Sequence, residues 1–327
     1  MPYNDLWKYC TQKDCREMIL SLRLLEPEDW EEEKILSCLY AVSNRTDRHY
    51  EEVRIPKKKG GTRCLMVPDP LLKLIQKNML LHILNGMEVS SYAAAYRKET
   101  PVLWNALPHV GKPVLLKLDI TDFFGNISFS AAAGRAFPRV YFPPAVQILL
   151  TSLCFCSGRL PQGAPTSPAI SNLVMKPFDD YMGEWCGGRQ IAYTRYSDDC
   201  TFSGDFNPWE VKAKAGHFLE AMGFSLNESK TKILSRGGRQ SVTGIVVNEK
   251  PQIDREYRRR LRQEIYYCEK FGVKAHLEKM GKEKYLKQGE EGIRRYILSL
   301  RGKTDYILLT NPGDRWFYEA KKRMKNW

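Results

Sequence analysis

The chain has 327 residues, 43% of them hydrophobic, which is enough for two or three subdomains around a substantial core. Its longest apolar run, residues 145–155, is too short and too polar to span a membrane, and the first ten residues lack the apolar core of a signal peptide. We therefore expect a cytoplasmic protein with no membrane partner. The net charge is +13, and residues 255–327 alone hold 20 basic and 10 acidic residues, so a basic tail on a nearly neutral body predicts a nucleic-acid clamp.

The cysteines argue against a metal or disulfide framework. There are nine, an odd number, and no two of them form a C-x2-C pair. Cys154 and Cys156 are the closest in sequence, and no histidine cluster accompanies them. This pattern predicts reduced, mostly buried thiols and argues against a zinc ribbon or a disulfide framework.

The first quarter of the chain predicts helices and a basic hairpin. Residues 13–43 have the pattern of two helices, the second opening at PEDWEEE with Pro27 near its first turn. The segments YEEVRIP and TRCLMVP have strand character and flank the basic turn KKKGG. The next segment predicts a helix with Asp69 as its N-cap and Pro70 at its first position.

The middle of the chain alternates between strand and helix patterns. Residues 112–120 are an apolar run that ends in an acid, as expected of a buried central strand. Residues 160–182 predict a Gly/Pro-rich loop and then a helix, on which the pair Asp179-Asp180 is most simply a solvated face. Further along the chain we expect a β-hairpin over 190–203, a helix over 206–224 and a strand pair over 241–253.

From residue 255 onward the pattern is helical. Four residues recur at helical spacing on one face, and three arginines occupy the other: Tyr257, Leu261, Ile265 and Cys268 against Arg258, Arg259 and Arg262. The arginines are either a solvated basic face or a helix surface that lies against phosphates.

Three carboxylates are the candidate catalytic group. Asp198 and Asp199 repel each other at the tip of the predicted hairpin, and Asp119 ends the apolar strand that would pack beside it. Hard oxygen ligands from two strands suit Mg²⁺, which takes its remaining ligands from water and substrate phosphates. Two such ions support phosphoryl transfer, and their charge neutralises the repulsion between the carboxylates.

Five motifs, in order, resemble those of a reverse transcriptase over nearly the whole chain. IPKKKGGTRCLMVP is similar to the fingers hairpin, LKLDITDFF to the first palm motif, LPQGAPTSP to the second, YSDD to the catalytic hairpin, and GFSLNESKTKIL to the lysine motif. The resemblance implies an α+β right-hand polymerase with fingers, a palm built on an antiparallel sheet, and a helical thumb. The implied domains are residues 1–92 (N-terminal helices and fingers), 93–252 (palm, with a fingers segment at about 126–158) and 253–327 (basic thumb).

The resemblance also implies roles for single residues. Asp119, Asp198 and Asp199 would hold two Mg²⁺ ions, for which Mn²⁺ could substitute. Around an incoming dNTP, backbone amides at Asp122 and Phe123 would meet the triphosphate, Phe124 would exclude a ribose 2′-OH, Arg63 would grip base and phosphate, and Gln162 and Gly163 would line the pocket. A packed core aromatic is the other interpretation of Phe124. Lys57 or Lys58 would accompany Arg63, and Lys230 would donate a proton to the leaving pyrophosphate, with Lys232 as a competitor.

Two shorter segments resemble signatures of bacterial retron enzymes. Asn105 and His109 fit an Asn-Ala-x-x-His pattern, and Val242, Thr243 and Gly244 fit a Val-Thr-Gly pattern. A retron enzyme would copy a structured non-coding RNA of the msr–msd type from a 2′-OH primer into branched, RNA-linked DNA (msDNA). Its implied partners are that RNA, its cDNA, dNTPs, host RNase H and a toxin or effector in anti-phage defence. The thumb would bind RNA through Arg258, Arg259, Arg262, Arg294 and Arg295.

Two alternatives stay open, and one residue departs from the pattern. The chain could be another bacterial reverse transcriptase, of the group II intron-like, abortive-infection or CRISPR-associated kind. It could also be a catalytically idle RNA-binding scaffold, although a scaffold has no physical need for the intact carboxylates, Arg63 and Lys230. Ser197 stands where retron enzymes usually carry Ala.

Overall fold

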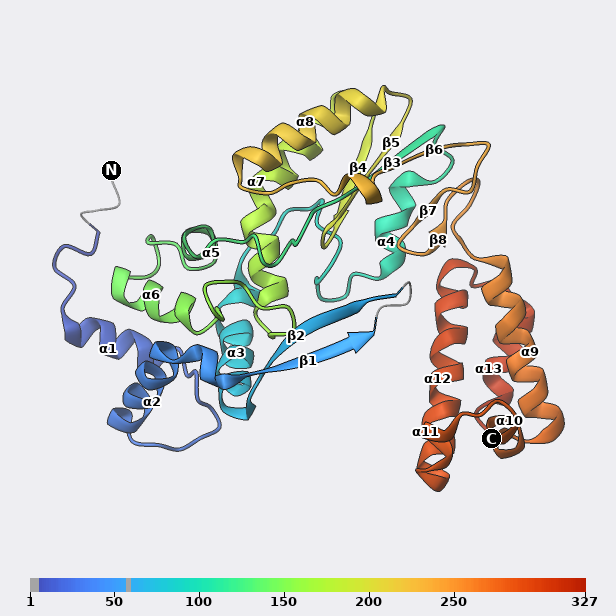
Figure 1. Ribbon diagram of the computed structural model, residues 1–327, viewed down its shortest axis with the longest axis horizontal. Helices are drawn as coiled ribbons and strands as arrows, with labels where there is room; N and C mark the ends of the chain where they lie inside the picture. Colours follow the sequence, from blue (N-terminus) through green and yellow to red (C-terminus); the bar gives the residue numbers. More distant parts are fainter. Residues whose placement is uncertain (1–5, 57–59) are drawn as a thin grey trace. The chain divides into compact units, whose positions relative to one another are not determined.

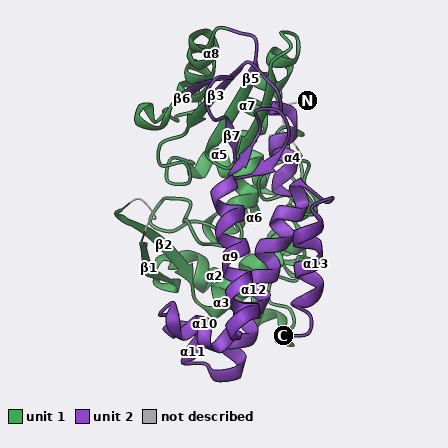
Figure 2. Cartoon of the chain, turned by 90° about the vertical axis from the view of Figure 1, so that its right-hand side faces the viewer, with its two compact units in different colours: residues 1–100, 116–202, 207–232 green, residues 101–115, 203–206, 233–327 purple. Residues whose placement is uncertain are grey.

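The computed structural model of the chain describes residues 6–56 and 60–327 (Figure 1). They form two compact units, which Figure 2 shows in two colours. Unit 1 comprises residues up to 100, 116–202 and 207–232, and unit 2 comprises residues 101–115, 203–206 and 233–327. The units cut across the expected fingers, palm and thumb, and that division stays a prediction.

Unit 1 begins with the helices α1 (Gln12–Ser21) and α2 (Glu32–Asn44). Thr11 and Asp14 form a capping box at the start of α1, in which each side chain accepts a hydrogen bond from the other residue's backbone N–H. The expectation that Pro27 lies near the first turn of the second helix is wrong. The segment before α2 forms a turn that buries Leu24 and Leu25, and the helix starts only where acidic residues supply its first turn.

A hairpin and a capped helix follow, and both are confirmed. Strands β1 (Tyr50–Pro56) and β2 (Thr62–Pro68) pair antiparallel along their whole length. Helix α3 (Pro70–His82) starts at Asp69, whose carboxylate accepts a hydrogen bond of 2.8 Å from the backbone N–H of Leu72. Residues 57–59, and with them Lys57 and Lys58, lie outside the described residues.

A four-stranded sheet has most of its residues in unit 1 and the rest in unit 2. Its strand order is β4 (Ala192–Tyr196), β5 (Asp199–Gly204), β3 (Val114–Asp119) and β6 (Lys232–Ser235). Strand β3 is interior and mostly buried, which confirms the predicted central strand. Strands β4 and β5 are neighbours joined by only two residues, so they form the predicted hairpin. The helices of this part of unit 1 are α5 (Phe129–Ala136), α6 (Pro144–Ser152), α7 (Ser167–Gly187) and α8 (Pro208–Ala221).

Asp179 corrects the expectation of a solvated face on α7. Its side chain is fully buried, and it accepts hydrogen bonds from Arg195 Nε at 2.8 Å, Arg195 Nη2 at 2.6 Å and the Tyr193 hydroxyl at 2.8 Å. Asp180, the next residue, is partly exposed and pairs with Lys176 at 3.0 Å. Helix α7 packs on β4, so consecutive aspartates on the helix meet different surroundings.

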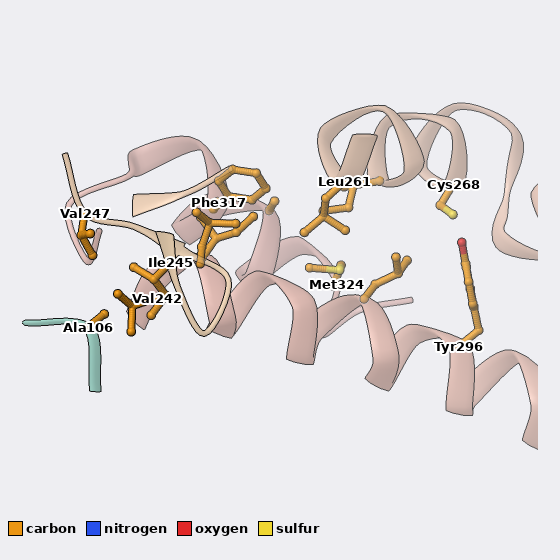
Figure 3. Packing of buried hydrophobic residues seen from close by; sticks show 14 of the residues in the cluster. Ala106, Val242, Ile245, Val247, Leu261, Cys268, Tyr296, Phe317 and Met324 are labelled. Atoms are coloured by element: carbon orange, nitrogen blue, oxygen red, sulfur yellow. The ribbon is translucent and has the colours of Figure 1, made fainter. Parts of the chain in front are cut away.

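Unit 2 is built on one apolar cluster (Figure 3). Leu261, Ile265 and Cys268 of α9 (Arg255–Phe271) are buried, which confirms three of the four residues expected on its inner face. Tyr257, the fourth, is 37% exposed. The cluster includes residues of α4 (Val102–Ala106), β7 (Ser241–Val242), β8 (Ile245–Val246), β9 (Gln252–Ile253), α10 (Val273–Lys279), α12 (Gly289–Thr310) and α13 (Arg315–Arg323), and α11 (Glu283–Leu286) packs against it.

The cysteine side chains and the helices can be compared with two expectations from the sequence, one about reduced and mostly buried thiols and one about membrane spans. Five of the nine cysteines are buried and all nine are free thiols, as predicted. Among the described residues, no helix is both long and apolar enough to cross a membrane.

Candidate active site

One hollow of unit 1 gathers most of the residues predicted for catalysis and nucleotide binding. Its lining includes Arg63, Asp119, Asp122, Phe123, Phe124, Gln162, Asp198, Asp199 and Lys230. They come from β2, the end of β3 and the loop after it, the loop before α7, the turn between β4 and β5, and the segment before β6. The fold thus brings together side chains that lie far apart in the sequence.

The loop before α7 reaches this hollow through backbone contact with β2. The N–H of Met66 donates a hydrogen bond of 2.9 Å to the carbonyl oxygen of Gln162. Gly163 follows with a φ of +123°, and a Cβ there would lie 2.9 Å from the carbonyl oxygen of Met66. Only glycine fits this close approach. Gly163 does not line the hollow itself, but it lets the loop that carries Gln162 lie against β2.

Lys230 is bonded to the carboxylate of Asp119. Its Nζ lies 2.8 Å and 2.9 Å from the two carboxylate oxygens. This hydrogen bond, with the negative charges of Asp119, Asp198 and Asp199, raises the pKa of Lys230 although burial opposes the shift. Lys230 is therefore protonated, and its positive charge compensates the most buried carboxylate of the three.

Asp199 has a different electrostatic environment. Burial raises the pKa of its carboxyl, and the charges of Asp198 and Asp119 raise it further, while Lys117 and Lys230 oppose the shift. A buried carboxylate whose neighbours are also negative gains from a bound cation. The interaction shows that the three carboxylates lie near enough to sense one another.

The carboxylates of Asp119, Asp198 and Asp199 are suitable ligands for a divalent metal, although they are not arranged as a complete metal site. Among residues 6–56 and 60–327, no three His, Cys, Asp or Glu side chains stand close enough to hold a metal ion as they are. Three carboxylates nevertheless line the same hollow, and an ammonium group is bonded to one of them where a cation would bind. Hard carboxylate oxygens are the ligands that Mg²⁺ prefers, so these residues fit the ion that the sequence predicts.

Backbone strain is concentrated in the same hollow. Tyr96, Asp122 and Ser197 line it and have φ angles of +60°, +40° and +60°, in the left-handed region that favours glycine. Each such conformation costs on the order of 1 kcal/mol. Strain of this kind persists where neighbouring contacts impose it, which is common at functional sites.

Phe123 and Phe124 occupy different environments. Phe123 is 4% exposed, packs against Phe224 with ring centroids 6.0 Å apart, and is a core aromatic. Phe124 is half-buried, lines the hollow and meets Phe123 edge-on with ring centroids 5.3 Å apart. The structure thus assigns the core role to Phe123 and leaves the ring of Phe124 at the cavity wall.

Three residues near the carboxylates escaped the sequence interpretation. Arg159 lies in the hollow, and its Nη1 is 3.3 Å from the Oδ2 of Asp122. Lys117 is close enough to Asp199 to oppose the rise of its pKa. Its position two residues before Asp119 on a strand places both side chains on one face, a signal that was present in the sequence. Tyr96 carried no such signal.

In unit 2 the two short signature segments pack together. The Nδ2 of Asn105 is 3.5 Å from the Oγ1 of Thr243, and His109 Nδ1 is 2.7 Å from the hydroxyl of Ser203. Asn105, His109 and Val242 are buried. Their burial favours a packing role over direct contact with RNA, and the RNA-binding role of the two segments stays a prediction. The three residues hold the segments together, and Thr243 and Gly244 form the more exposed turn beside them.

The predicted RNA-binding arginines are not equivalent. Arg259 and Arg294 are exposed. Arg295 pairs with Glu291 at 3.1 Å. Arg258 has a buried Nε with no hydrogen-bond partner among the residues that the structure describes. The guanidinium of Arg262 lies 5.4 Å and 5.1 Å from the ring centroids of Trp316 and Phe317, and 3.5 Å from a carboxylate oxygen of Asp314.

Comparison with known families identifies the class of protein. Residues 55–280 match the family described as reverse transcriptase (RNA-dependent DNA polymerase). The match covers more than half of the chain, so the chain belongs to this family. Its fold class is the α+β right-hand polymerase that the sequence motifs predicted.

The relatives define the branch of that family, the bacterial retron type. The chain is 36% identical over 239 residues to the retron Mx65 reverse transcriptase of Myxococcus xanthus, covering 67% of this chain and 56% of that protein. It is 29% identical over 283 residues to the retron Ec86 reverse transcriptase of Escherichia coli, covering 85% and 83%. It is 31% identical over 238 residues to the retron Ec83 reverse transcriptase of Escherichia coli, covering 67% and 75%. The chain thus spans little more than half the length of the Mx65 protein and most of the other two.

Proposed function

We propose that the chain is an RNA-directed DNA polymerase whose active site is the hollow of unit 1. The observation that carries this proposal is the meeting of three carboxylates, Arg63, Gln162 and Lys230 in one hollow. Carboxylates bind the metal ions of phosphoryl transfer, and an arginine binds phosphate in a bidentate way. A binding scaffold has no use for this combination.

We assign a separate role in nucleotide addition to each group of side chains in the hollow. Asp119, Asp198 and Asp199 would hold two Mg²⁺ ions, with Mn²⁺ as a substitute, and the bound ions would supply Lewis-acid stabilisation of the transferring phosphoryl group. Arg63 binds the triphosphate and base, and backbone amides around Asp122 meet the phosphates. Lys230 is protonated in the free enzyme, so it has a proton to give to the pyrophosphate oxygen.

Three further residues set selectivity within the same proposal. The ring of Phe124 lies at the cavity wall. There it would stand against the ribose 2′ position and select dNTPs. Gln162 lines the hollow and Gly163 lets its loop approach β2. Lys57 or Lys58, in the sequence between β1 and β2, would add positive charge to the phosphate-binding group.

We further propose that the enzyme serves a retron in the cytoplasm. It copies a structured msr–msd type RNA from a 2′-OH primer into msDNA, host RNase H trims the RNA, and a toxin or effector partner acts with it in anti-phage defence. The similarity to several retron reverse transcriptases supports this proposal. So does the basic surplus after residue 255, which suits binding to RNA phosphates.

A pair of aspartate variants tests the catalytic proposal by primer extension on an RNA template with dNTPs and Mg²⁺. Asp198→Ala is expected to lower the rate about a thousandfold, because several kcal/mol of transition-state charge stabilisation are lost. Asp180→Ala is the matched control, since it removes a carboxylate from the other Asp-Asp pair, outside the hollow. Equal rates in wild type and Asp198→Ala would refute the catalytic role.

A separate experiment tests the retron proposal. The chain is expressed with the non-coding DNA that neighbours its gene, and nucleic acid is examined for RNA-linked single-stranded DNA before and after RNase treatment. We expect a branched product that depends on an intact Asp198. Active primer extension without branched DNA would instead favour another class of bacterial reverse transcriptase.

A further inference from the structure

The turn that carries Asp198 and Asp199 starts at a strained residue. Ser197 is 7% exposed and has a φ of +60°, in a two-residue turn whose first position requires a positive φ. Glycine adopts this conformation without cost, and serine does not. Contacts from outside the turn must therefore hold it in place.

The first contact comes from Tyr96. Its hydroxyl and that of Ser197 are 2.9 Å apart and share a hydrogen bond. Tyr96 has a φ of +60° itself, so two strained residues face each other across this bond. The segment before Tyr96 is tied to β4, because the N–H of Arg195 donates to the carbonyl oxygen of Tyr92 at 2.9 Å and the N–H of Ala94 donates to that of Arg195 at 2.7 Å. These backbone hydrogen bonds fix the position of the segment that leads to Tyr96.

The second contact comes from Arg195. Its Nη1 donates a hydrogen bond of 2.9 Å to the carbonyl oxygen of Ser197. The guanidinium is fully buried and is fixed by Asp179, with Nη2 also 3.2 Å from the Oδ1 of Asn172. Asn172 in turn donates a hydrogen bond of 2.8 Å to the carbonyl oxygen of Ala95, next to Tyr96. The Ser197 carbonyl and hydroxyl are therefore held from one connected network.

The turn is also joined to the strand that ends in Asp119. The N–H of Ile120, the next residue, donates a hydrogen bond of 3.0 Å to the carbonyl oxygen of Asp198. A shift of the turn therefore changes the spacing between Asp198 and Asp119. Because metal affinity depends on how well ligands are prearranged, that spacing bears on cation binding.

We propose that Tyr96 is a positioning residue of the active site, which acts through the Ser197 hydroxyl to hold Asp198 and Asp199 in place for divalent cations. This inference rests on the proposed polymerase function. An alanine at position 197 would leave the Tyr96 hydroxyl without this partner. The pairing of Tyr96 with Ser197 is thus a property of this chain's own residues, and it explains why a serine is accepted at the turn.

The test is a double-mutant cycle with two readouts. Tyr96→Phe, Ser197→Ala and the double variant are compared with wild type, and Tyr40→Phe on α2 serves as a tyrosine control. Mn²⁺ binding is measured by electron paramagnetic resonance of free Mn²⁺, with primer–template and a non-hydrolysable dNTP present. Primer extension is then measured across a range of Mg²⁺ concentrations, and the melting temperature of each variant is recorded.

Both single variants are expected to weaken Mn²⁺ binding about three- to tenfold, the range that loss of one neutral hydrogen bond produces. The double variant is expected to match either single one, because both remove the same bond. The Mg²⁺ concentration for half-maximal rate should rise by the same factor, while the KM for dNTP at saturating Mg²⁺ and the melting temperature stay near wild type.

Three outcomes overturn the inference. The first is unchanged Mn²⁺ binding in both single variants. The second is a double variant in which the two factors of weakened Mn²⁺ binding multiply. The third is weaker Mn²⁺ binding in Tyr96→Phe but not in Ser197→Ala. The last would assign the Tyr96 hydroxyl to direct contact with nucleic acid. Loss of activity in Asp198→Ala together with any of these results would leave the polymerase proposal intact, so the two failures are distinguishable.

Discussion

At the scale of single residues, Asp119 has two competing partners, Lys230 and a divalent cation. In the free enzyme the ammonium group of Lys230 neutralises Asp119, which is also a predicted metal ligand. A divalent cation and Lys230 therefore compete for the same carboxylate oxygens. Lys230 is also the predicted proton donor to pyrophosphate, so its removal should have two effects of opposite sign.

We expect Lys230→Met to lower the maximal rate of primer extension about a hundredfold, the lower end of what a general acid contributes. The Mg²⁺ concentration for half-maximal rate should fall, because the ammonium group no longer competes for Asp119. Steady-state kinetics across Mg²⁺ concentrations measure both effects. Lys232→Met is the matched control, since Lys232 is exposed and is the other candidate donor. A larger rate loss in Lys232→Met would transfer the role to that residue.

At the scale of elements, α7 shows how packing separates two identical neighbours. Asp179 faces β4 and forms an ion pair with Arg195 in which neither side chain is exposed. Burial by itself would lower the pKa of Arg195, but the charge and hydrogen bonds of Asp179 raise it, so the guanidinium stays charged. Removing one partner leaves the other charge buried and uncompensated.

Asp179→Asn is therefore expected to reduce the free energy of unfolding by about 3–5 kcal/mol. Asp180→Asn, the matched control, should cost less than about 1 kcal/mol, because its pair with Lys176 is partly exposed. Urea denaturation followed by circular dichroism gives both values. Similar losses in the two variants would show that the pair at Asp179 is not the buried network that the structure describes.

At the scale of the whole molecule, charge is distributed unevenly along the chain. Residues 255–327 carry a surplus of +10 out of a total of +13. Within that segment some arginines bind neighbouring side chains and others face solvent. The arginines that pack on or pair with neighbouring side chains stabilise unit 2 even where they are partly exposed, as Arg262 is, and we expect exposed arginines such as Arg259 to be the more available for phosphates.

Arg259→Gln and Arg262→Gln test this distinction. We expect Arg259→Gln to weaken RNA binding and to reduce the slope of log affinity against log salt by about 1, since one phosphate contact is lost. Arg262→Gln should change the slope little and lower the melting temperature, because its guanidinium packs on Trp316 and Phe317. Filter binding at several salt concentrations and thermal melting decide between these outcomes. A reversed pattern would contradict the assignment.

The sequence by itself determined the features that depend on local patterns. Strand and helix periodicity, the Asp69 cap and the turn signals indicated many of the elements, such as the β1–β2 hairpin, α3, β3 and the β4–β5 hairpin, and motif order indicated the family. The hollow with its carboxylates was predictable because one of them ends a buried strand and the other two lie in the turn of a neighbouring hairpin. Each of these signals spans a few residues, so no knowledge of packing was needed to find it.

Only the tertiary structure decided which residues meet. The burial of Asp179 against Arg195, the bond between Lys230 and Asp119, the pairing of Tyr96 with Ser197 and the burial of His109 all join distant segments. The side-chain repeat of a strand (2 residues) or a helix (3.6 residues) indicates which face of the element a residue lies on. It does not indicate what packs against that face. The sequence motif did not explain why a serine stands at position 197. The structure does, because Tyr96 and Arg195 hold the strained Ser197 through hydrogen bonds.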